Sequence, residues 1–160
     1  MSTTKLRTTP AQAAEAAAEL DRTDRAILRA LQRDASVSNV ALACLRRVER
    51  LKAAGLVKGI VALLDAQALE LGMLVMIGVV LDRSTPDSFA DFEKAAQKVS
   101  GCLECHVVTG EFDYFMLVRT RDNDSFNRLH AEQLLYLPGV RQIRTFVVLK
   151  QVLSTTQLPI

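Results

Sequence analysis

Two cysteines and a histidine stand close together in the run Cys102-Leu103-Glu104-Cys105-His106. The spacing C-x-x-C-H attaches c-type haem, and C-x-x-C pairs also bind zinc or form a redox-active disulfide. Haem attachment requires export, and the N-terminus carries no hydrophobic signal core. Side chains three positions apart on a β-strand point to opposite faces, so Cys102 and Cys105 would not reach one ligand together. We therefore predict small buried side chains without a metal, haem or redox role.

The remaining polar residues form no catalytic pattern. The only histidines are His106 and His130, which are too few for a zinc cluster and have no paired nucleophile for a triad. His130 lies between Phe126 and Leu134 at helical spacing, which is typical of the edge of a core. We predict neither an enzyme nor a cofactor.

A turn of four residues, Gly110-Glu111-Phe112-Asp113, has groups suited to binding a free amino acid. Without a Cβ, Gly110 lets a ligand approach the main chain, and Asp113 offers a charged acceptor for an ammonium group. The nearby strand residues Val108 and Val148 suit an aliphatic side chain. The alternative is that Gly110 only supplies hairpin geometry and Asp113 only caps the turn. Both readings stay open.

Basic residues gather in a predicted helix over residues 44–54, which Gly55 ends. The candidates for phosphate contact are Arg46, Arg47, Arg50 and Lys52, although a solvated helical face is the usual fate of such a run. Residues 1–60 carry 11 Lys+Arg and 6 Asp+Glu, whereas residues 61–160 carry 9 and 12. This charge asymmetry indicates a nucleic-acid-binding N-terminal domain followed by a domain with another role.

The bulk composition limits the remaining classes of protein. With 49% hydrophobic residues the chain can bury a core, and 160 residues suit one ordinary domain or two small ones. The three cysteines show no obvious pairing, which fits a reducing compartment. No apolar run approaches the roughly 20 residues of a membrane helix. We expect a cytoplasmic protein without a membrane partner.

The second half of the chain repeats one order of elements on either side of the Gly110–Asp113 turn. The expected elements are a strand at 73–81, a helix opened by Thr85-Pro86, strands at 103–109 and 114–120, a helix capped by Asp122, and a strand at 140–152. This order is the ferredoxin-like βαββαβ pattern. The strand at 73–81 is almost wholly apolar, which favours cover on both faces, in part by a second subunit.

The first part of the chain reads as helices. Asp21 is a good N-cap with Asp24 in the first turn, and Ile27, Leu28 and Leu31 then share one face. Ser38 is expected to cap a second helix, and residues 56–64 read as a strand or wing.

Taken in order, these motifs resemble the leucine-responsive/asparagine-synthetase-regulator (Lrp/AsnC) family of bacterial transcription regulators. The resemblance is carried by residues 20–28, 37–40, 44–51 with Gly55, 109–114 and 145–148. It implies an α+β protein with an N-terminal winged helix-turn-helix at 20–64 and a ferredoxin-like effector-binding domain at 72–153. Residues 1–19 would form a flexible arm, 65–71 a linker and 154–160 a tail. The alternative for the first segment is a short helix at Pro10–Glu19, with Thr9 and Gln12 in capping-box spacing.

The resemblance also implies partners. DNA would be duplex and contacted by Arg46, Arg47, Arg50 and Lys52. A small amino acid, with leucine or methionine favoured, would bind between effector domains at Val108, Thr109, Gly110, Glu111, Phe112, Asp113 and Val148. Homodimers paired through the effector sheets would assemble into tetramers or octamers.

One departure from the family stands between Ala43 and Cys44, which are adjacent here. The family carries about nine residues at this point, including the start of the helix that enters the major groove. Either those residues belong to the protein and are not in this sequence, or they are deleted. In the second case we expect an amino-acid-sensing and oligomerisation module without DNA binding. A further alternative is that residues 39–54 form one continuous helix, with Val40, Cys44, Val48 and Leu51 along one face.

Overall fold

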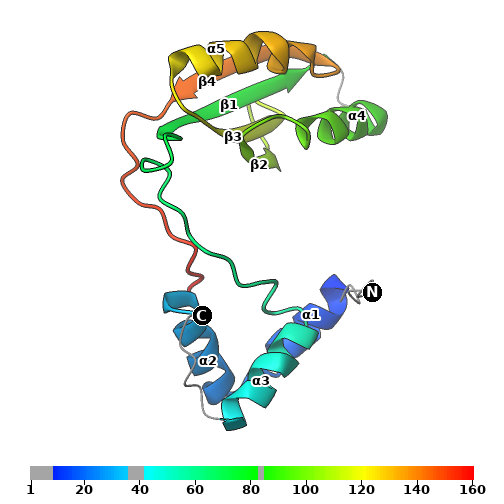
Figure 1. The fold of residues 1–160 in the computed structure, drawn as a ribbon. Helices are drawn as coiled ribbons and strands as arrows, with labels where there is room; N and C mark the ends of the chain where they lie inside the picture. The colour runs from blue at the N-terminus through cyan, green and yellow to red at the C-terminus, as the bar shows by residue number, and fades with distance from the viewer. Residues whose placement is uncertain (1–8, 36–41, 83–84) are drawn as a thin grey trace, which may run out of the picture. The chain divides into compact units, whose positions relative to one another are not determined.

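The computed structural model describes residues 9–35, 42–82 and 85–160. The chain divides into two compact units (Figure 1). The helical unit consists of the described residues of Met1–Leu63 together with Leu153–Ile160, and the sheet unit is Leu64–Val152.

The helical unit contains α1 (Pro10–Ala18), α2 (Arg22–Arg33) and α3 (Leu42–Ala53). In the described part of the expected arm, α1 is the short helix that was the alternative there. The predicted N-cap of α2 is confirmed, because the Asp21 carboxylate accepts the Asp24 N–H at 2.7 Å and the Asp24 carboxylate accepts the Asp21 N–H at 3.3 Å. The predicted stop is also confirmed, since Gly55 has a φ of 76° directly after α3. The core between α2 and α3 consists of Ile27, Leu28, Val48 and Leu51.

The junction between Ala43 and Cys44 lies inside α3, which runs through it as one helix. The expected cap at Ser38 falls outside the described residues. Of the strand or wing expected at 56–64, the strand is wrong, because these residues form neither helix nor strand. Instead, the start of segment 56–64 is hydrogen-bonded to the end of α3. Leu51 O accepts the N–H groups of Leu56 and Val57 at 3.0 and 3.4 Å.

The sheet unit has the predicted βαββαβ order. Its elements are β1 (Met73–Leu81), α4 (Pro86–Ala96), β2 (Cys102–Val107), β3 (Tyr114–Thr120), α5 (Asn123–Glu132), the short 3-10 helix η1 (Leu134–Tyr136) and β4 (Val140–Val147). The strands lie in the order β2-β3-β1-β4, and every pair is antiparallel (Figure 1). The predicted caps are confirmed, with Thr85 at α4 and Asp122 at α5.

One face of the sheet packs on the helices. This core comprises Val75, Ile77, Val79, Leu81, Phe92, Ala96, Val99, Tyr114, Met116, Val118, Phe126, Leu129, Leu134 and Leu137. The opposite face carries aromatic rings, with Phe112 5.0 Å from Phe115 and 6.3 Å from Phe146 between centroids. Met76 and Phe146 on this face are 42% and 45% exposed. The sheet therefore has one helix-covered face and one aromatic face.

The last strand is shorter than predicted. The expected strand at 140–152 ends at Val147, which pairs with Val75. Beyond Val147, the Val148 N–H still donates to Leu74 O at 2.9 Å, next to the start of β1 at Met73. None of the described helices is both long enough and apolar enough to cross a membrane.

Candidate DNA-binding and effector sites

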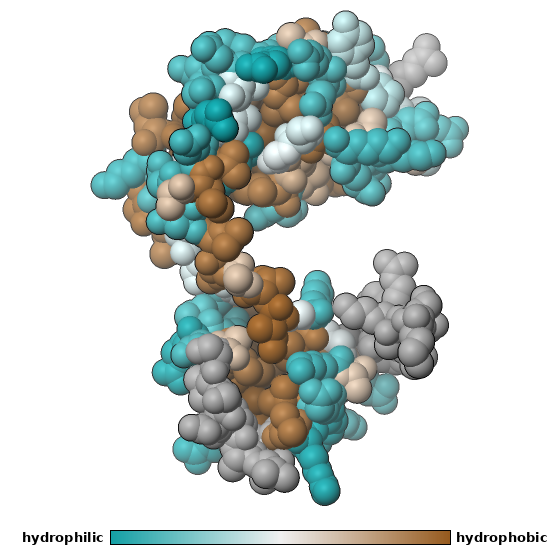
Figure 2. Space-filling view, in the orientation of Figure 1, coloured by the Kyte–Doolittle hydropathy of each residue, from teal (hydrophilic) through white to brown (hydrophobic). Residues whose placement is uncertain are grey.

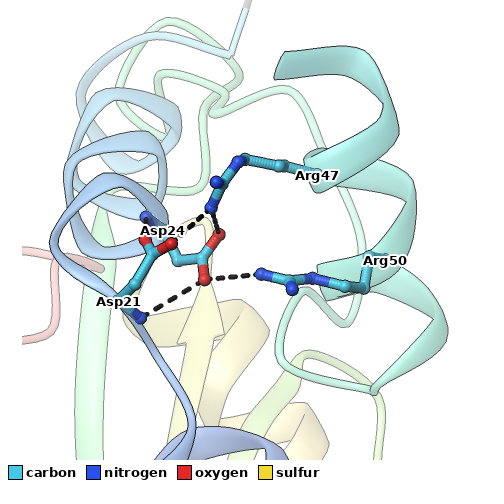
Figure 3. A network of polar contacts seen from close by, with 4 residues as sticks. All are labelled: Asp21, Asp24, Arg47 and Arg50. Carbon is cyan, nitrogen blue, oxygen red and sulfur yellow. Dashed lines mark hydrogen bonds and ion pairs between the residues drawn. The ribbon is translucent and has the colours of Figure 1, made fainter. Parts of the chain in front are cut away.

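Two arginines of α3 point at the first turn of α2 (Figure 3). Arg47 Nη1 lies 2.6 Å from Asp21 Oδ2 and 2.9 Å from Asp24 Oδ1. Arg50 Nη2 lies 2.5 Å from Asp24 Oδ2. The Asp24 side chain is only 1% exposed, so this network joins a buried carboxylate to two partly exposed cations.

The network keeps Asp24 charged inside the helical unit. Burial raises the pKa of Asp24, but hydrogen bonds from Arg47, the Asp21 N–H and Arg50 outweigh it and leave that pKa below its usual value. The hydrogen bond from Arg47 likewise lowers the pKa of Asp21. A buried carboxylate is tolerated only when it is paired and hydrogen-bonded, so Arg47 and Arg50 have a structural role.

The four predicted phosphate contacts therefore differ in their surroundings. Arg47 and Arg50 hold the first turn of α2, and Lys52 Nζ lies 2.9 Å from Glu49 Oε1 on its own helix. Arg46 is exposed and takes part in no ion pair within the described part of the chain. Of the four, Arg46 is the side chain best placed to meet a phosphate. Sequence alone assigned Asp24 to the helix dipole and missed its burial.

The effector turn is anchored by Asp113. Its carboxylate Oδ2 accepts the Leu81 N–H at 2.8 Å, and its own N–H donates to Val79 O at 2.9 Å. Its carbonyl accepts the Val108 N–H at 3.0 Å, which closes the hairpin. The capping role left open by the sequence is thus present.

Gly110 leaves open space beside this anchored turn. Its φ is 118°, a conformation that side chains disfavour, and no heavy atom of the described residues lies within 4 Å of the position a Cβ would take, chain neighbours aside. Thr109 beside it is exposed, and Val108 is half-buried. A ligand can therefore approach the main chain here.

The other side of the turn is held against the sheet. The Phe112 ring covers Gly78, where an added Cβ would come within 2.7 Å of the ring. The Arg144 guanidinium lies 5.7 Å from the centre of that ring, and Arg144 Nη1 lies 2.6 Å from Glu111 Oε1. Glu111 and Phe112 thus connect the turn to β4.

Val148 does not join this group within one chain. It pairs with Leu74 near the start of β1, whereas the turn contacts Val79 and Leu81 at its end. Seven residues of strand separate the two ends, about 23 Å at roughly 3.3 Å per residue. Antiparallel pairing places the end of β4 there, so Val148 would serve this site only from another subunit.

The expectation that Cys102 and Cys105 face opposite sides of the sheet is wrong. Cys102 pairs with Val118 and Cys105 with Met116, because a β-bulge lies between Cys102 and Glu104. The extra residue shifts the alternation, so both thiols face the side of the sheet that carries α4. His106 is opposite Phe115 on the other face. No group of three or more metal-ligating side chains occurs in the ranges described.

The two thiols border a cavity of about 560 Å³ between α4 and β2. Its lining includes Glu93 and Tyr114, and the Tyr114 hydroxyl donates to Glu93 Oε1 at 2.8 Å. Burial and this hydrogen bond raise the pKa of Tyr114, so the hydroxyl stays protonated at neutral pH.

We expect both thiols to be unreactive at neutral pH. The buried side chains expected from the sequence are wrong, because Cys102 is half-buried and Cys105 is exposed. Desolvation by the surrounding protein still raises the pKa of Cys102, and desolvation together with the nearby Cys102 and Glu93 raises the pKa of Cys105 to about 11. Only the thiolate is alkylated, so the rate at Cys105 should rise about tenfold per pH unit toward that value. Pulsed iodoacetamide labelling read by peptide mass spectrometry measures it. A rate that levels off below pH 9.0, the ordinary thiol value, contradicts the expectation.

Known proteins share this fold and both domains. Residues 20–58 match a winged helix-turn-helix DNA-binding domain, and residues 74–158 match the Lrp/AsnC ligand binding domain. The leucine-responsive regulatory protein of Klebsiella pneumoniae is 41% identical over 151 residues, covering 89% of this chain and 92% of the relative. A Neisseria meningitidis transcriptional regulator, solved as an L-Met complex, superposes with a TM-score of 0.82 at 34% identity, over 88% of this chain and 96% of that one. An AsnC family regulator from Agrobacterium tumefaciens, at 22% identity, shares the fold with a TM-score of 0.83 over 88% and 97%.

The match to the Klebsiella relative also bears on the junction in α3. It spans 151 residues, whereas 89% of this 160-residue chain is about 142 residues, about nine fewer. That difference equals the length expected to be lacking between Ala43 and Cys44. Identity, coverage and the order of both domains agree, and the chain belongs to the Lrp/AsnC family of transcriptional regulators, with a winged helix-turn-helix DNA-binding domain followed by a ferredoxin-like ligand-binding domain.

Proposed function

We propose that this regulator responds to a small apolar amino acid, leucine or methionine, bound at the Gly110–Asp113 turn. The observation that carries the proposal is the open main chain at Gly110 beside the fixed carboxylate of Asp113. Exposed N–H groups suit the ligand carboxylate, and the Asp113 carboxylate suits its ammonium. Two relatives support this choice of ligand, since one is named for leucine and another was solved with L-Met.

The substitution Asp113→Asn tests the site without removing its anchor. An amide oxygen still accepts the Leu81 N–H, so the hairpin should persist, but the charge that holds an ammonium is gone. We expect methionine or leucine affinity to fall at least about tenfold, the loss expected for one charge-assisted hydrogen bond. Titration calorimetry measures it.

The matched control is Asp124→Asn, the same chemical change at an exposed position in the first turn of α5. It should bind the amino acid as the unmodified chain does. If Asp113→Asn binds equally well, Asp113 is a cap and nothing more. If neither amino acid binds the unmodified chain, the proposed ligand class is wrong.

The aromatic face of the sheet is the proposed surface for a second copy. Phe112, Phe115, Phe146 and Met76 form an apolar patch there with only partial cover. The segments beyond the sheet also expose apolar side chains, among them Val61, Leu63, Leu64, Leu149 and Val152 (Figure 2). Patches of this kind mark protein–protein contacts.

We expect the chain to be a dimer or a larger symmetric assembly at micromolar concentration. Replacing Phe146 with aspartate places a charge in the aromatic patch and should shift the assembly toward monomer. Light scattering with in-line size exclusion gives the mass. The control Arg141→Asp puts the same side chain at an exposed position near the start of β4. A monomeric unmodified chain would contradict the expectation.

An alternative function follows from the shortened helix-turn-helix. A chain about nine residues shorter than its relative across the matched region would sense amino acids and assemble, yet lack the residues that read bases. Such a chain would still co-assemble through the sheet unit. A DNA-binding measurement on the chain with this sequence decides between a DNA-binding regulator and a module that only senses amino acids and assembles.

A further inference from the structure

The segment Leu153–Ile160 forms neither helix nor strand, yet it belongs to the helical unit. It lies against α2 through main-chain hydrogen bonds. Gln32 Oε1 accepts the Leu158 N–H at 2.5 Å, and Gln32 Nε2 donates to Leu158 O at 3.2 Å. Arg29 Nε donates to Ile160 O at 2.5 Å.

These contacts define a specific docking surface on α2. The side-chain amide of Gln32 bonds both the N–H and the C=O of Leu158, as a neighbouring strand would. Gln32 therefore recognises extended backbone at Leu158. The Leu158 side chain is 69% exposed and therefore contributes little buried apolar area to the docking. Arg29 and Gln32 are three residues apart and share one helix face.

An apolar contact completes the docking. Ile160 is half-buried and packs against the cluster of Ile27, Leu28, Val48 and Leu51 that joins α2 to α3. The residues that come last in this sequence therefore help to cover the core of a unit formed by its first 63. Two distant parts of the chain thus build the helical unit, which contains the residues matched to the DNA-binding domain.

The same segment is continuous with the strand that contacts the effector turn. β4 carries Arg144, which pairs with Glu111 of the turn at 2.6 Å, and β4 ends at Val147. Only residues 148–152 stand between that strand and the docked segment. The turn is thus linked to α2 by one ion pair, one strand and a short connection. A contiguous route carries coupling when it has two arrangements that both sites bias, and the experiment below tests for this.

We propose that Leu153–Ile160 is a docking segment whose contact with Arg29 and Gln32 couples amino-acid binding at the Gly110–Asp113 turn to the DNA-binding domain. This inference rests on the proposed function for its ligand. Coupling is reciprocal, so weakening the docking must change amino-acid affinity by the factor with which the amino acid changes docking. That reciprocity allows a test without DNA.

The test compares Gln32→Ala with Arg33→Ala, the exposed neighbour on the same helix. Hydrogen exchange measures docking directly. The Leu158 amide should exchange roughly tenfold faster in Gln32→Ala, because its acceptor is gone, and should be unchanged in Arg33→Ala. Equal exchange in all three proteins would overturn the docking itself.

Calorimetry with methionine then measures coupling in the same three proteins. We expect the Kd to change by about threefold or more in Gln32→Ala, in the range of ordinary allosteric coupling, and not in Arg33→Ala. An unchanged Kd with faster Leu158 exchange would overturn the coupling and leave the segment as cover for the core. Absence of methionine binding to the unmodified chain would overturn the proposed ligand, and with it the coupling, whereas the exchange result would still decide the docking.

Discussion

Replacing Arg47 and Arg50 together with alanine should lower the melting temperature of the helical unit by several degrees. The double substitution leaves the Asp24 carboxylate buried without its two cations. An unpaired buried charge is among the few changes that destabilise a small unit strongly. The remaining bonds to Asp24, from the N–H of Asp21, do not compensate for a lost counter-ion. Far-UV circular dichroism during heating, with α2 amide exchange to assign the transition, measures the effect.

Two further proteins separate this cause from a general loss of positive charge. Arg46→Ala removes a cation from the exposed side of the same helix and should leave the transition nearly unchanged. Asp24→Asn added to the double variant removes the buried charge, while its amide can still accept the Asp21 N–H, and should restore part of the loss. Equal melting of the double variant and Arg46→Ala would show that the network contributes nothing.

The same network contributes to the response of stability to acid. The pKa of Asp24 is lower in the folded chain than its ordinary value of 3.8, so the unfolded chain binds the proton more tightly. The stability that Asp24 contributes is therefore fully present above pH 3.8 and is lost as the pH falls through the folded value. Asp24→Asn should flatten this acid limb, which melting curves from about pH 6 downward would show.

Sequence predicted the regular elements well because each has a local cause. Asp21, Thr85 and Asp122 cap their helices as their side-chain chemistry requires, and Gly55 ends α3 at a positive φ. The strands at Met73–Leu81 and Tyr114–Thr120 have the predicted bounds. In these places the signal lies within a few residues of the element it specifies.

The errors concern features set by distant partners. The bulge beside Cys102 depends on the register against β3, and the end of β4 depends on where β1 begins. Neither is encoded in the residues where the prediction was made. A strand at 56–64 would have needed a partner strand, which the described part of the chain does not supply.

The candidate sites were predictable from the sequence only where the contacts are local in the chain. Gly110 and Asp113 were found because turn chemistry is local, and the structure places both in one turn. Arg47 was assigned to DNA because its charge is visible in the sequence, whereas the buried carboxylate it faces lies 23 residues away in the chain. Charge counts give the sign of a surface but not which cations are already paired.

The ion pairs of Arg47 and Arg50 matter for DNA binding, because cations already paired within the chain are less available to phosphate. The largest expected effect is on DNA affinity and specificity. If the residues that the family carries between Ala43 and Cys44 are deleted, the chain should bind duplex DNA weakly and with little preference for sequence, because those residues normally reach base edges from a recognition helix. Arg46 remains exposed for a phosphate, but phosphate contacts carry no sequence information. Binding should fall steeply as salt rises, since each phosphate contact releases counterions.

Inserting the corresponding segment of the Klebsiella relative, about nine residues by the difference in matched length, between Ala43 and Cys44 should restore specific binding. The probe is a duplex selected from random sequence by the restored protein, and the competitor is a shuffled duplex. We expect the restored protein to prefer the selected duplex by about 10³ or more, the usual range for specific regulators, and the chain as it stands to show no such preference. Arg46→Ala in the restored protein should weaken binding to both duplexes alike and reduce the salt slope by about one. An equal preference for the selected duplex before and after the insertion would show that α3 already reads bases. The junction between Ala43 and Cys44 would then not impair sequence-specific binding.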